Sequence, residues 1–276
     1  MSFRWGETEG QSLYVDNFSL ECASWGPPPD KAPTLVLLHE GLGCVAMWKD
    51  FPQKLRDETG FGVFAYSRAG YGGSDPVALP RPINYMPLEA KITLSNVLDQ
   101  IGFQRGILCG HSDGATIASS YAASVSDQRV RGLILLAPHF FTEAMGLNAI
   151  LAAKRAYDVG DLKERLAKYH KNVDIAFRGW NDVWLNPDFK DMDVADCIDH
   201  WRIPVLTIQG REDQYGSLAQ ITEIEERIYS PLEIVIMKHC GHAPQFEQPE
   251  KTLQVIKEFT ATLERLEQEV VSIAAV

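Results

Sequence analysis

The sequence contains no apolar run long enough to cross a lipid bilayer. Its longest run, Gly132–Pro138, falls far short of the about 20 residues that a transmembrane helix needs. The opening residues, MSFRWGETEG, also lack the apolar core of a secretory signal peptide. We therefore expect a cytoplasmic protein.

Cysteine is also scarce. The chain has five cysteines, an odd number, and no C-x-x-C pair. This usage predicts neither a disulfide framework nor a cysteine zinc site, and it favours a reducing compartment. His239, Cys240 and His242 lie close together, but their spacing fits no common zinc pattern. We expect no metal and no cofactor.

Positive charge is in deficit and is not clustered. The chain carries 26 Lys and Arg against 37 Asp and Glu, a formal net charge of -11. Such a surface repels nucleic-acid phosphates and anionic lipid headgroups. We therefore expect no nucleic acid and no membrane as a partner, and the charge indicates no particular partner in their place. The oligomeric state stays open.

Apolar stretches of strand length recur along the chain. Two short alternations, Leu13–Val15 and Phe18–Cys22, predict an antiparallel hairpin. Six continuous runs are apolar on both faces, which is typical of parallel strands covered on both sides: Thr34–Leu38, Val63–Tyr66, Gly106–Cys109, Leu133–Ala137, Val205–Ile208 and Glu233–Met237. Helical patterns separate them, for example over Pro87–Ile101 and from Pro249 onward. The alternation predicts an α/β protein with a doubly wound, mostly parallel, eight-stranded sheet.

One long stretch, residues 138–201, interrupts this alternation. It shows no strand pattern, but it contains helical patterns over Ala149–Tyr157 and Leu162–His170. Insertions of this kind often cover active sites at the carboxyl ends of strands. We expect a core of residues 1–137 and 202–276 and a helical cap or lid of residues 138–201.

A candidate nucleophile lies at the end of one predicted strand. Ser112 is the centre of Gly110-His111-Ser112-Asp113-Gly114, a G-x-S-x-G motif between an apolar strand and a helix of small residues. A serine on a sharp turn there projects its hydroxyl above the sheet, and the helix N-terminus presents free N–H groups to developing negative charge. The alternative is a turn whose serine only caps the helix; the strand–turn–helix context favours the nucleophile.

A second glycine-rich loop, HEGLG, follows the strand Thr34–Leu38. An acyl-transfer intermediate carries a negative oxygen, which two backbone N–H groups must bind. The residue after the nucleophile, Asp113, supplies one of them. We predict Gly41 as the second, with Glu40 as the alternative. An ordinary glycine-rich connection between strand and helix would have the same composition.

Three segments together resemble the α/β-hydrolase superfamily: LHEGLG, SRAGYGGSDP at Ser67–Pro76, and GHSDG. The resemblance spans about residues 13–266 and is closest to small bacterial carboxylesterases and hydrolases of aromatic ring-cleavage products. It implies the α/β-hydrolase fold. Two residues depart from the family pattern: Glu40 stands where glycine is usual, and Asp113 stands where Met, Gln or Leu is common. Both place carboxylates near the serine.

The resemblance also implies a nucleophile, acid and base in the chain order Ser, Asp, His. Asp213 follows the strand Val205–Ile208 and His242 follows the strand Glu233–Met237. A histidine can exchange a proton near neutral pH, and a carboxylate orients the ring. We predict Ser112, Asp213 and His242 as the catalytic triad. The alternatives are Glu212 for the acid and His239 for the base.

Several further side chains are candidates for an apolar substrate pocket, although for each one core packing is an equally good interpretation. They are Glu40, Met47, Trp48, Tyr71, His139, Phe140, Trp180 and Trp184.

These observations favour a serine hydrolase that cleaves a carboxylic ester of a small apolar or aromatic substrate through an acyl-enzyme. One alternative is a C–C bond hydrolase of aromatic ring-cleavage products, for which Arg178 is a candidate carboxylate-binding residue. Thioester or lactone hydrolysis is another. An inactive hydrolase-fold protein that only binds a ligand is the alternative of a different class, and intact Ser, Asp and His residues count against it.

Overall fold

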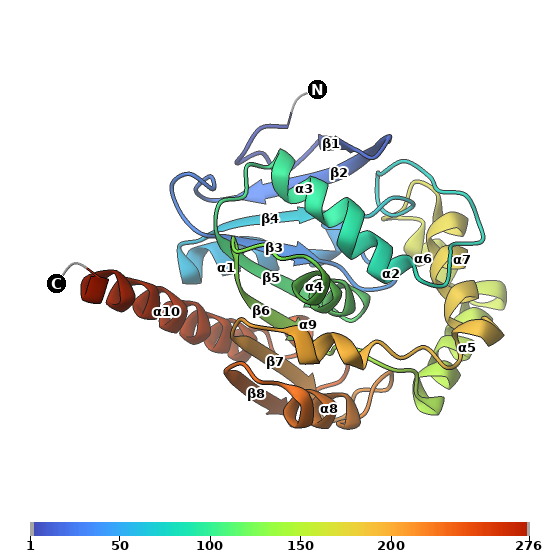
Figure 1. Ribbon diagram of the computed structural model, residues 1–276. Coiled ribbons are helices and arrows are strands. Elements are labelled where there is room, and N and C mark those ends of the chain that lie inside the picture. The colour runs from blue at the N-terminus through green and yellow to red at the C-terminus, as the bar shows by residue number, and fades with distance from the viewer. Residues whose placement is uncertain (1–2, 275–276) are drawn as a thin grey trace.

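The apolar runs of the sequence form one sheet in the computed structural model, which describes residues 3–274 and the side chains up to residue 269. The strand order is β1-β2-β4-β3-β5-β6-β7-β8 (Figure 1). β2 pairs antiparallel with β1 and with β4, and all other pairs are parallel. The strands are β1 (Gln11–Val15), β2 (Phe18–Trp25), β3 (Thr34–Leu38), β4 (Gly62–Tyr66), β5 (Gly106–His111), β6 (Val130–Leu136), β7 (Val205–Gly210) and β8 (Leu232–Met237). The predicted doubly wound, mostly parallel, eight-stranded sheet and its N-terminal hairpin are confirmed.

Helices cover both faces of this sheet. Those of the core are η1 (Val45–Trp48), α1 (Phe51–Thr59), α2 (Tyr85–Leu88), η2 (Glu89–Leu94), α3 (Ser95–Gln100), α4 (Asp113–Ser124), α8 (Ala219–Arg227), α9 (Pro244–Glu247) and α10 (Pro249–Ala274). The predicted helix Pro87–Ile101 corresponds to α2, η2 and α3, and its middle part, η2, is π-helical. Among the described residues, no helix combines the length and apolar character needed to span a bilayer.

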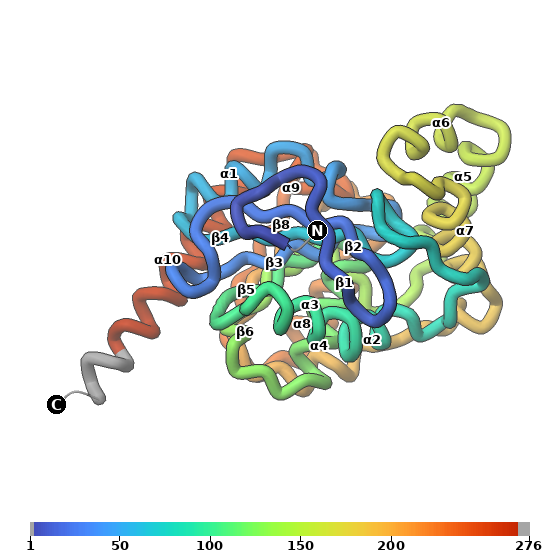
Figure 2. The backbone as a smooth tube through the Cα atoms, turned by 90° about the horizontal axis from the view of Figure 1, so that it is seen from above, coloured from blue at the N-terminus to red at the C-terminus, as the bar shows by residue number. Residues whose placement is uncertain are grey.

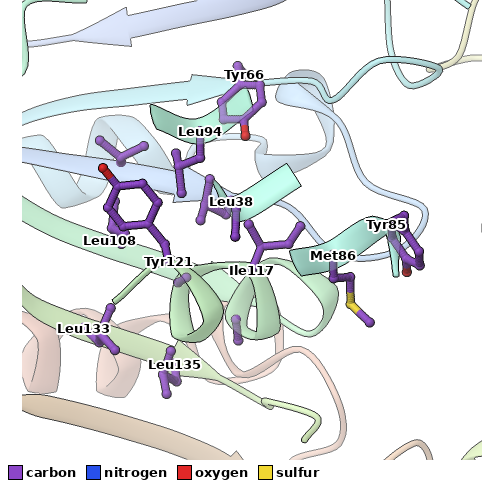
Figure 3. Close-up of a cluster of buried hydrophobic side chains, with 14 of the residues drawn as sticks. Leu38, Tyr66, Tyr85, Met86, Leu94, Leu108, Ile117, Tyr121, Leu133 and Leu135 are labelled. Atoms are coloured by element: carbon purple, nitrogen blue, oxygen red, sulfur yellow. The ribbon is translucent and has the colours of Figure 1, made fainter. Parts of the chain in front are cut away.

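The core lies in two layers, because successive side chains of a strand point to opposite faces of a sheet. On β3, Val36 and Leu38 belong to one buried cluster, and Leu35 and Leu37 belong to the other. The first cluster lies between the sheet and the helices α2, η2, α3 and α4 and continues into the segment between β6 and β7. Figure 3 shows part of it, with labelled side chains from the strands and from α2, η2 and α4. The second lies beneath η1, α1 and α10. Burial of the central strands on both faces explains why their sequences are continuously apolar.

The segment between β6 and β7 forms α5 (Ala144–Val159), α6 (Leu162–Leu166), α7 (Val173–Trp184), η3 (Pro187–Phe189) and η4 (Ala195–His200). Its strand content is one isolated bridge between Phe141 and Asp193. In Figures 1 and 2, α5, α6 and α7 lie at the opposite end of the molecule from the far end of α10. The predicted helix Leu162–His170 was wrong at its end, since α6 stops at Leu166 and His170 lies just after the turn that follows. That this segment acts as a cap stays a prediction.

Candidate active site

Ser112 occupies a strained turn between β5 and α4. Its backbone has φ 53° and ψ -118°, a conformation that residues other than glycine rarely adopt. A Cβ on Gly110 would lie 2.2 Å from the carbonyl oxygen of Gly114, and a Cβ on Gly114 would lie 1.9 Å from that of Leu38. Both positions therefore require glycine. The side chain of Ser112 makes no helix-capping hydrogen bond, so the turn is not explained by capping.

Asp213 and His242 form a hydrogen-bonded pair. Nδ1 of His242 lies 2.7 Å from Oδ2 of Asp213, and because a carboxylate accepts, Nδ1 carries the proton. Asp213 also accepts from Nε2 of Gln209 at 2.9 Å and from the N–H of Tyr215 at 2.8 Å. Burial raises the pKa of Asp213, but the His242 and Tyr215 hydrogen bonds outweigh it and leave the pKa below its ordinary value. The carboxylate is therefore ionised and fixes the orientation of the ring.

The two alternative residues, Glu212 and His239, contact each other instead. The side chain of His239 is 90% exposed and its Nδ1 lies 3.4 Å from Oε1 of Glu212, which is itself 56% exposed. This pair therefore lies in solvent. By contrast, the side chain of Asp213 is 1% exposed and that of His242 is 13% exposed.

His111 links the serine turn to the histidine loop. It directly precedes Ser112, and its ring centroid lies 5.0 Å from that of His242. Nε2 of His111 lies 2.8 Å from the backbone carbonyl oxygen of His242 and must be the donor. Its Nδ1 faces Nε2 of Gln245 at 3.0 Å and Oε2 of Glu40 at 3.5 Å. The ends of β5 and β8 are thereby held together, and Ser112 and His242 lie in the same region.

The loop after β3 is held from the core side by Arg68. The guanidinium group of Arg68 donates to the carbonyl oxygens of His39, at 2.5 Å, and Glu40, at 2.9 Å. The backbone N–H of Arg68 donates to Nε2 of His39, whose Nδ1 therefore donates to the carbonyl of Glu40 at 2.7 Å. Burial keeps the pKa of His39 well below its ordinary value, so the ring is neutral.

The same loop is held from the other side by the segment between β6 and β7. His170 accepts from the N–H of Gly72 through Nδ1 and donates through Nε2 to the carbonyl of Leu42, both at 2.9 Å. A Cβ on Gly41 would lie 2.2 Å from Nε1 of Trp180, so glycine is required for this close approach. The expected oxyanion donor therefore lies directly beneath α7.

Asp113, the other expected oxyanion donor, has a buried side chain. Its Oδ2 accepts from the hydroxyl of Tyr85, which in turn accepts from Nε1 of Trp184 at 3.2 Å. Burial raises the pKa of Asp113, opposed by the nearby charge of Arg68 and by the Tyr85 hydrogen bond. Tyr85 was missed from the sequence, because it precedes the expected helix and carries no motif.

A small cavity adjoins Ser112; the space between its side chains, part of it open to solvent, amounts to about 310 Å³. Its lining residues are Ser112, Asp113, His139, Glu143, Gly146, Leu147, Ile150, Trp180, Trp184 and Tyr215. The ring centroids of His139 and Tyr215 lie 5.5 and 4.8 Å from that of His242, so these two lining residues separate the cavity from the Asp213–His242 pair by one side chain. Burial, followed by the charge of His242, lowers the pKa of His139 to about 3.

Of the residues predicted for a pocket, His139, Trp180 and Trp184 line this cavity. Glu40, Met47, Trp48, Tyr71 and Phe140 are not among the described residues that line it. Trp48 stacks on Phe51, and Phe140 packs against Trp201, both in the core. Tyr71 packs against the rings of His39 and His170. For these aromatic residues, core packing is the role that the structure shows.

A model of the Alpha/beta hydrolase family matches residues 35–255, and the chain belongs to this family. Epoxide hydrolase 3 of Xenopus tropicalis is 20% identical over 272 residues, covering 82% of this chain and 71% of the relative. A 2-hydroxy-6-oxononadienedioate/2-hydroxy-6-oxononatrienedioate hydrolase of Paraburkholderia phymatum is 25% identical over 257 residues, covering 82% and 86%. An esterase structure from Exiguobacterium antarcticum superimposes with a TM-score of 0.73 at 19% identity, covering 91% of this chain and 99% of that one. These similarities establish the hydrolase family and the fold, and the named substrates differ.

Proposed function

We propose that this protein is a serine hydrolase that cleaves carboxylic esters of small substrates through an acyl-enzyme. Ser112 is the nucleophile, His242 the general base and Asp213 the residue that orients it. The observation that carries the proposal is the strained, uncapped Ser112 turn beside a cavity, two of whose lining residues, His139 and Tyr215, pack against the ring of His242.

In this mechanism Nε2 of His242 takes the proton of the Ser112 hydroxyl as the oxygen attacks the ester carbonyl. Nδ1 of His242 donates its proton to Asp213 in a hydrogen bond, so Nε2 is the basic nitrogen. The carboxylate of Asp213 also stabilises the imidazolium ion that forms. His242 returns the proton to the departing alcohol. A water molecule, deprotonated by His242, then attacks the acyl-enzyme. The acid is released as Ser112 regains its proton from His242.

The negative oxygen of each tetrahedral intermediate binds the backbone N–H groups of Asp113 and Gly41. Arg68 supports this role, because its hydrogen bonds to His39 and Glu40 set the path of the loop that carries Gly41. The N-terminus of α4 adds a favourable dipole at Asp113.

The alternative of C–C bond hydrolysis loses its candidate carboxylate-binding residue. Nη2 of Arg178 lies 2.6 Å from Oδ1 of Asp158, and Arg178 is also within 4.0 Å of Asp182. Arg178 does not line the cavity beside Ser112 among the described residues. Its guanidinium is therefore already paired, and ester cleavage is the better-supported reaction.

The test is a substrate panel combined with covalent labelling. Wild type, Ser112→Ala and the exposed control Ser126→Ala are compared on 4-nitrophenyl esters of graded acyl length, a thioester, a lactone and a ring-cleavage diketone. A fluorophosphonate probe is expected to label wild type and Ser126→Ala, but not Ser112→Ala. Ester turnover is expected to fall at least about 10³-fold in Ser112→Ala. Undiminished ester turnover in correctly folded Ser112→Ala would overturn the proposal, and faster cleavage of the diketone than of every ester would reassign the reaction.

A further inference from the structure

We propose that the cavity beside Ser112 binds a positively charged alkylammonium group, so that the preferred substrates are esters carrying a protonated amine. This inference rests on the proposed function and specifies the substrate class of that site. It follows from the charges, the unpaired oxygen and the aromatic side chains of the cavity lining.

The lining carries negative charge without a matching cation. Two of its residues, Asp113 and Glu143, are carboxylates, and no lysine or arginine is among the lining residues in the described chain. Within residues 3–269, the side-chain hydrogen bonds of these carboxylates come from neutral donors: Tyr85 for Asp113, and the Ser217 N–H and Gln220 for Glu143. Carboxylates in a confined site attract cations and repel anions.

Asp113 has a free acceptor atom. Oδ2 accepts from Tyr85, but Oδ1 is buried and has no hydrogen-bond partner among the described residues. Leaving a buried acceptor unpaired is unfavourable, and more so for a charged group. An ammonium N–H placed in the cavity supplies the missing donor.

Arg68 does not fill this role. It lies close enough to influence the pKa of Asp113. Both terminal guanidinium nitrogens nevertheless donate to the backbone carbonyls of His39 and Glu40 rather than to the carboxylate. The third guanidinium nitrogen, Nε, is buried without a partner in the described part of the chain and makes no hydrogen bond to Asp113, so Oδ1 of Asp113 remains open to a donor from a ligand.

Glu143 is held in a fixed position by neutral donors. Its Oε2 accepts from the N–H of Ser217 at 2.9 Å and from Nε2 of Gln220 at 2.8 Å. These bonds orient the carboxylate without cancelling its charge. His139, the basic residue of the lining, is kept neutral by burial and adds no opposing charge.

The remaining lining suits the body of an alkylammonium ion. Trp180, Trp184 and Tyr215 supply aromatic rings, whose faces attract cations. Leu147 and Ile150 supply apolar contact for an alkyl stem. The lining combines carboxylates with aromatic and aliphatic side chains, and it therefore differs from that of a purely apolar acyl pocket.

The experiment uses ester pairs that differ only in charge. On the acyl side, 4-nitrophenyl 6-aminohexanoate is compared with the heptanoate, in which a methyl group replaces the ammonium, and with the anionic adipate monoester. On the alcohol side, 2-(dimethylamino)ethyl butanoate is compared with 3-methylbutyl butanoate at pH 7. We expect kcat/KM to be at least about tenfold higher for the charged member of at least one pair, and lowest for the adipate.

Variants connect the preference to the carboxylates. Asp113→Asn and Glu143→Gln are each expected to reduce the charged-to-neutral ratio at least about fivefold. The exposed control Glu164→Gln is expected to leave the ratio unchanged. The neutral ester in each pair serves as the internal reference, because Asp113 is also placed in the oxyanion site.

Binding without turnover separates this inference from the proposed function. Calorimetry on Ser112→Ala is expected to show hexylammonium binding that is weakened in Ser112→Ala/Asp113→Asn, with hexanoate binding at least about tenfold more weakly than hexylammonium. Ser112-dependent turnover with equal rates within both pairs, or hexanoate binding as tightly as hexylammonium, would overturn the cationic site. Hexylammonium binding in a protein that hydrolyses no ester would support the site and overturn the esterase assignment.

Discussion

Nε2 of His111 donates a 2.8 Å hydrogen bond to the backbone carbonyl oxygen of His242, across 131 positions of the chain. His111 is one of the two variable positions of the G-x-S-x-G turn, and its side chain reaches the loop that carries the proposed base. The ring therefore couples the position of the nucleophile to that of the base. Each of the following predictions tests one such relationship.

Replacing His111 with alanine removes the donor and leaves the carbonyl oxygen of His242 without its partner. We expect kcat for a 4-nitrophenyl ester to fall about 10- to 100-fold, because small displacements of a base weaken proton transfer strongly. KM should change much less, since His111 does not line the cavity in the described chain. Steady-state kinetics and the rate of fluorophosphonate labelling measure the effect. A change confined to KM would contradict this positioning role.

Asp213→Asn should impair catalysis far more than Glu212→Gln. The carboxylate of Asp213 is buried against His242, whereas Glu212 is exposed and contacts His239. We expect a loss of about 10³–10⁴-fold in kcat for Asp213→Asn and less than about threefold for Glu212→Gln. Equal losses in the two variants would remove the assignment of the acid.

Gly41→Ala should disturb the contact between the loop after β3 and α7. The added Cβ would lie 2.2 Å from Nε1 of Trp180, so one of the two must move. We expect the unfolding free energy to fall by about 1–3 kcal/mol. If the loop moves instead, we expect kcat to fall. The double variant Gly41→Ala/Trp180→Leu should recover part of the loss. Additive losses in the double variant would show that the contact is not the cause.

Acidification should destabilise the protein through its buried neutral histidines. The pKa of His139 is lowered to about 3, below the value near 6.5 of an unfolded chain. Between these two pH values, the unfolded chain binds a proton on His139 and the folded protein does not. The unfolding free energy is therefore at its full value above about pH 6.5 and decreases as the pH falls below it. The slope for one such group is about 1.4 kcal/mol per pH unit.

Urea unfolding at pH 7.5 and pH 5.5 measures this loss. In His139→Gln the difference between the two pH values should shrink by about 1.4 kcal/mol, because the variant side chain does not titrate. His39 and His170, whose pKa values are also lowered by burial, should retain their share of the pH dependence. An unchanged difference in His139→Gln would show that His139 is not the group responsible.

The order of elements and the motif residues were accessible from sequence because they depend on local rules. Continuous apolar runs predict buried parallel strands, and all eight strands form. The glycines around Ser112 are dictated by close backbone contacts within one strand–turn–helix unit. Asp213 and His242 follow β7 and β8, and parallel neighbours must end at the same edge of a sheet.

The cavity lining was harder to predict because it depends on how distant segments meet. Trp48 and Phe140 are aromatic residues near the motifs, yet they pack into the core. Glu143 and Tyr215 line the cavity and carry no motif. Composition alone does not distinguish an aromatic ring in the core from one beside a cavity.

The sequence by itself determined the family and the succession of strands along the chain, and it predicted the residues proposed for acyl transfer, because each depends on residue type and short spacing. Only the tertiary structure paired His242 with Asp213 and His239 with Glu212, placed Tyr85 against Asp113, and left one oxygen of Asp113 without a partner among the described residues. Those outcomes depend on burial and on contacts between segments far apart in the chain. Such contacts cannot be read from a short stretch of sequence, because they form only when the whole chain has packed.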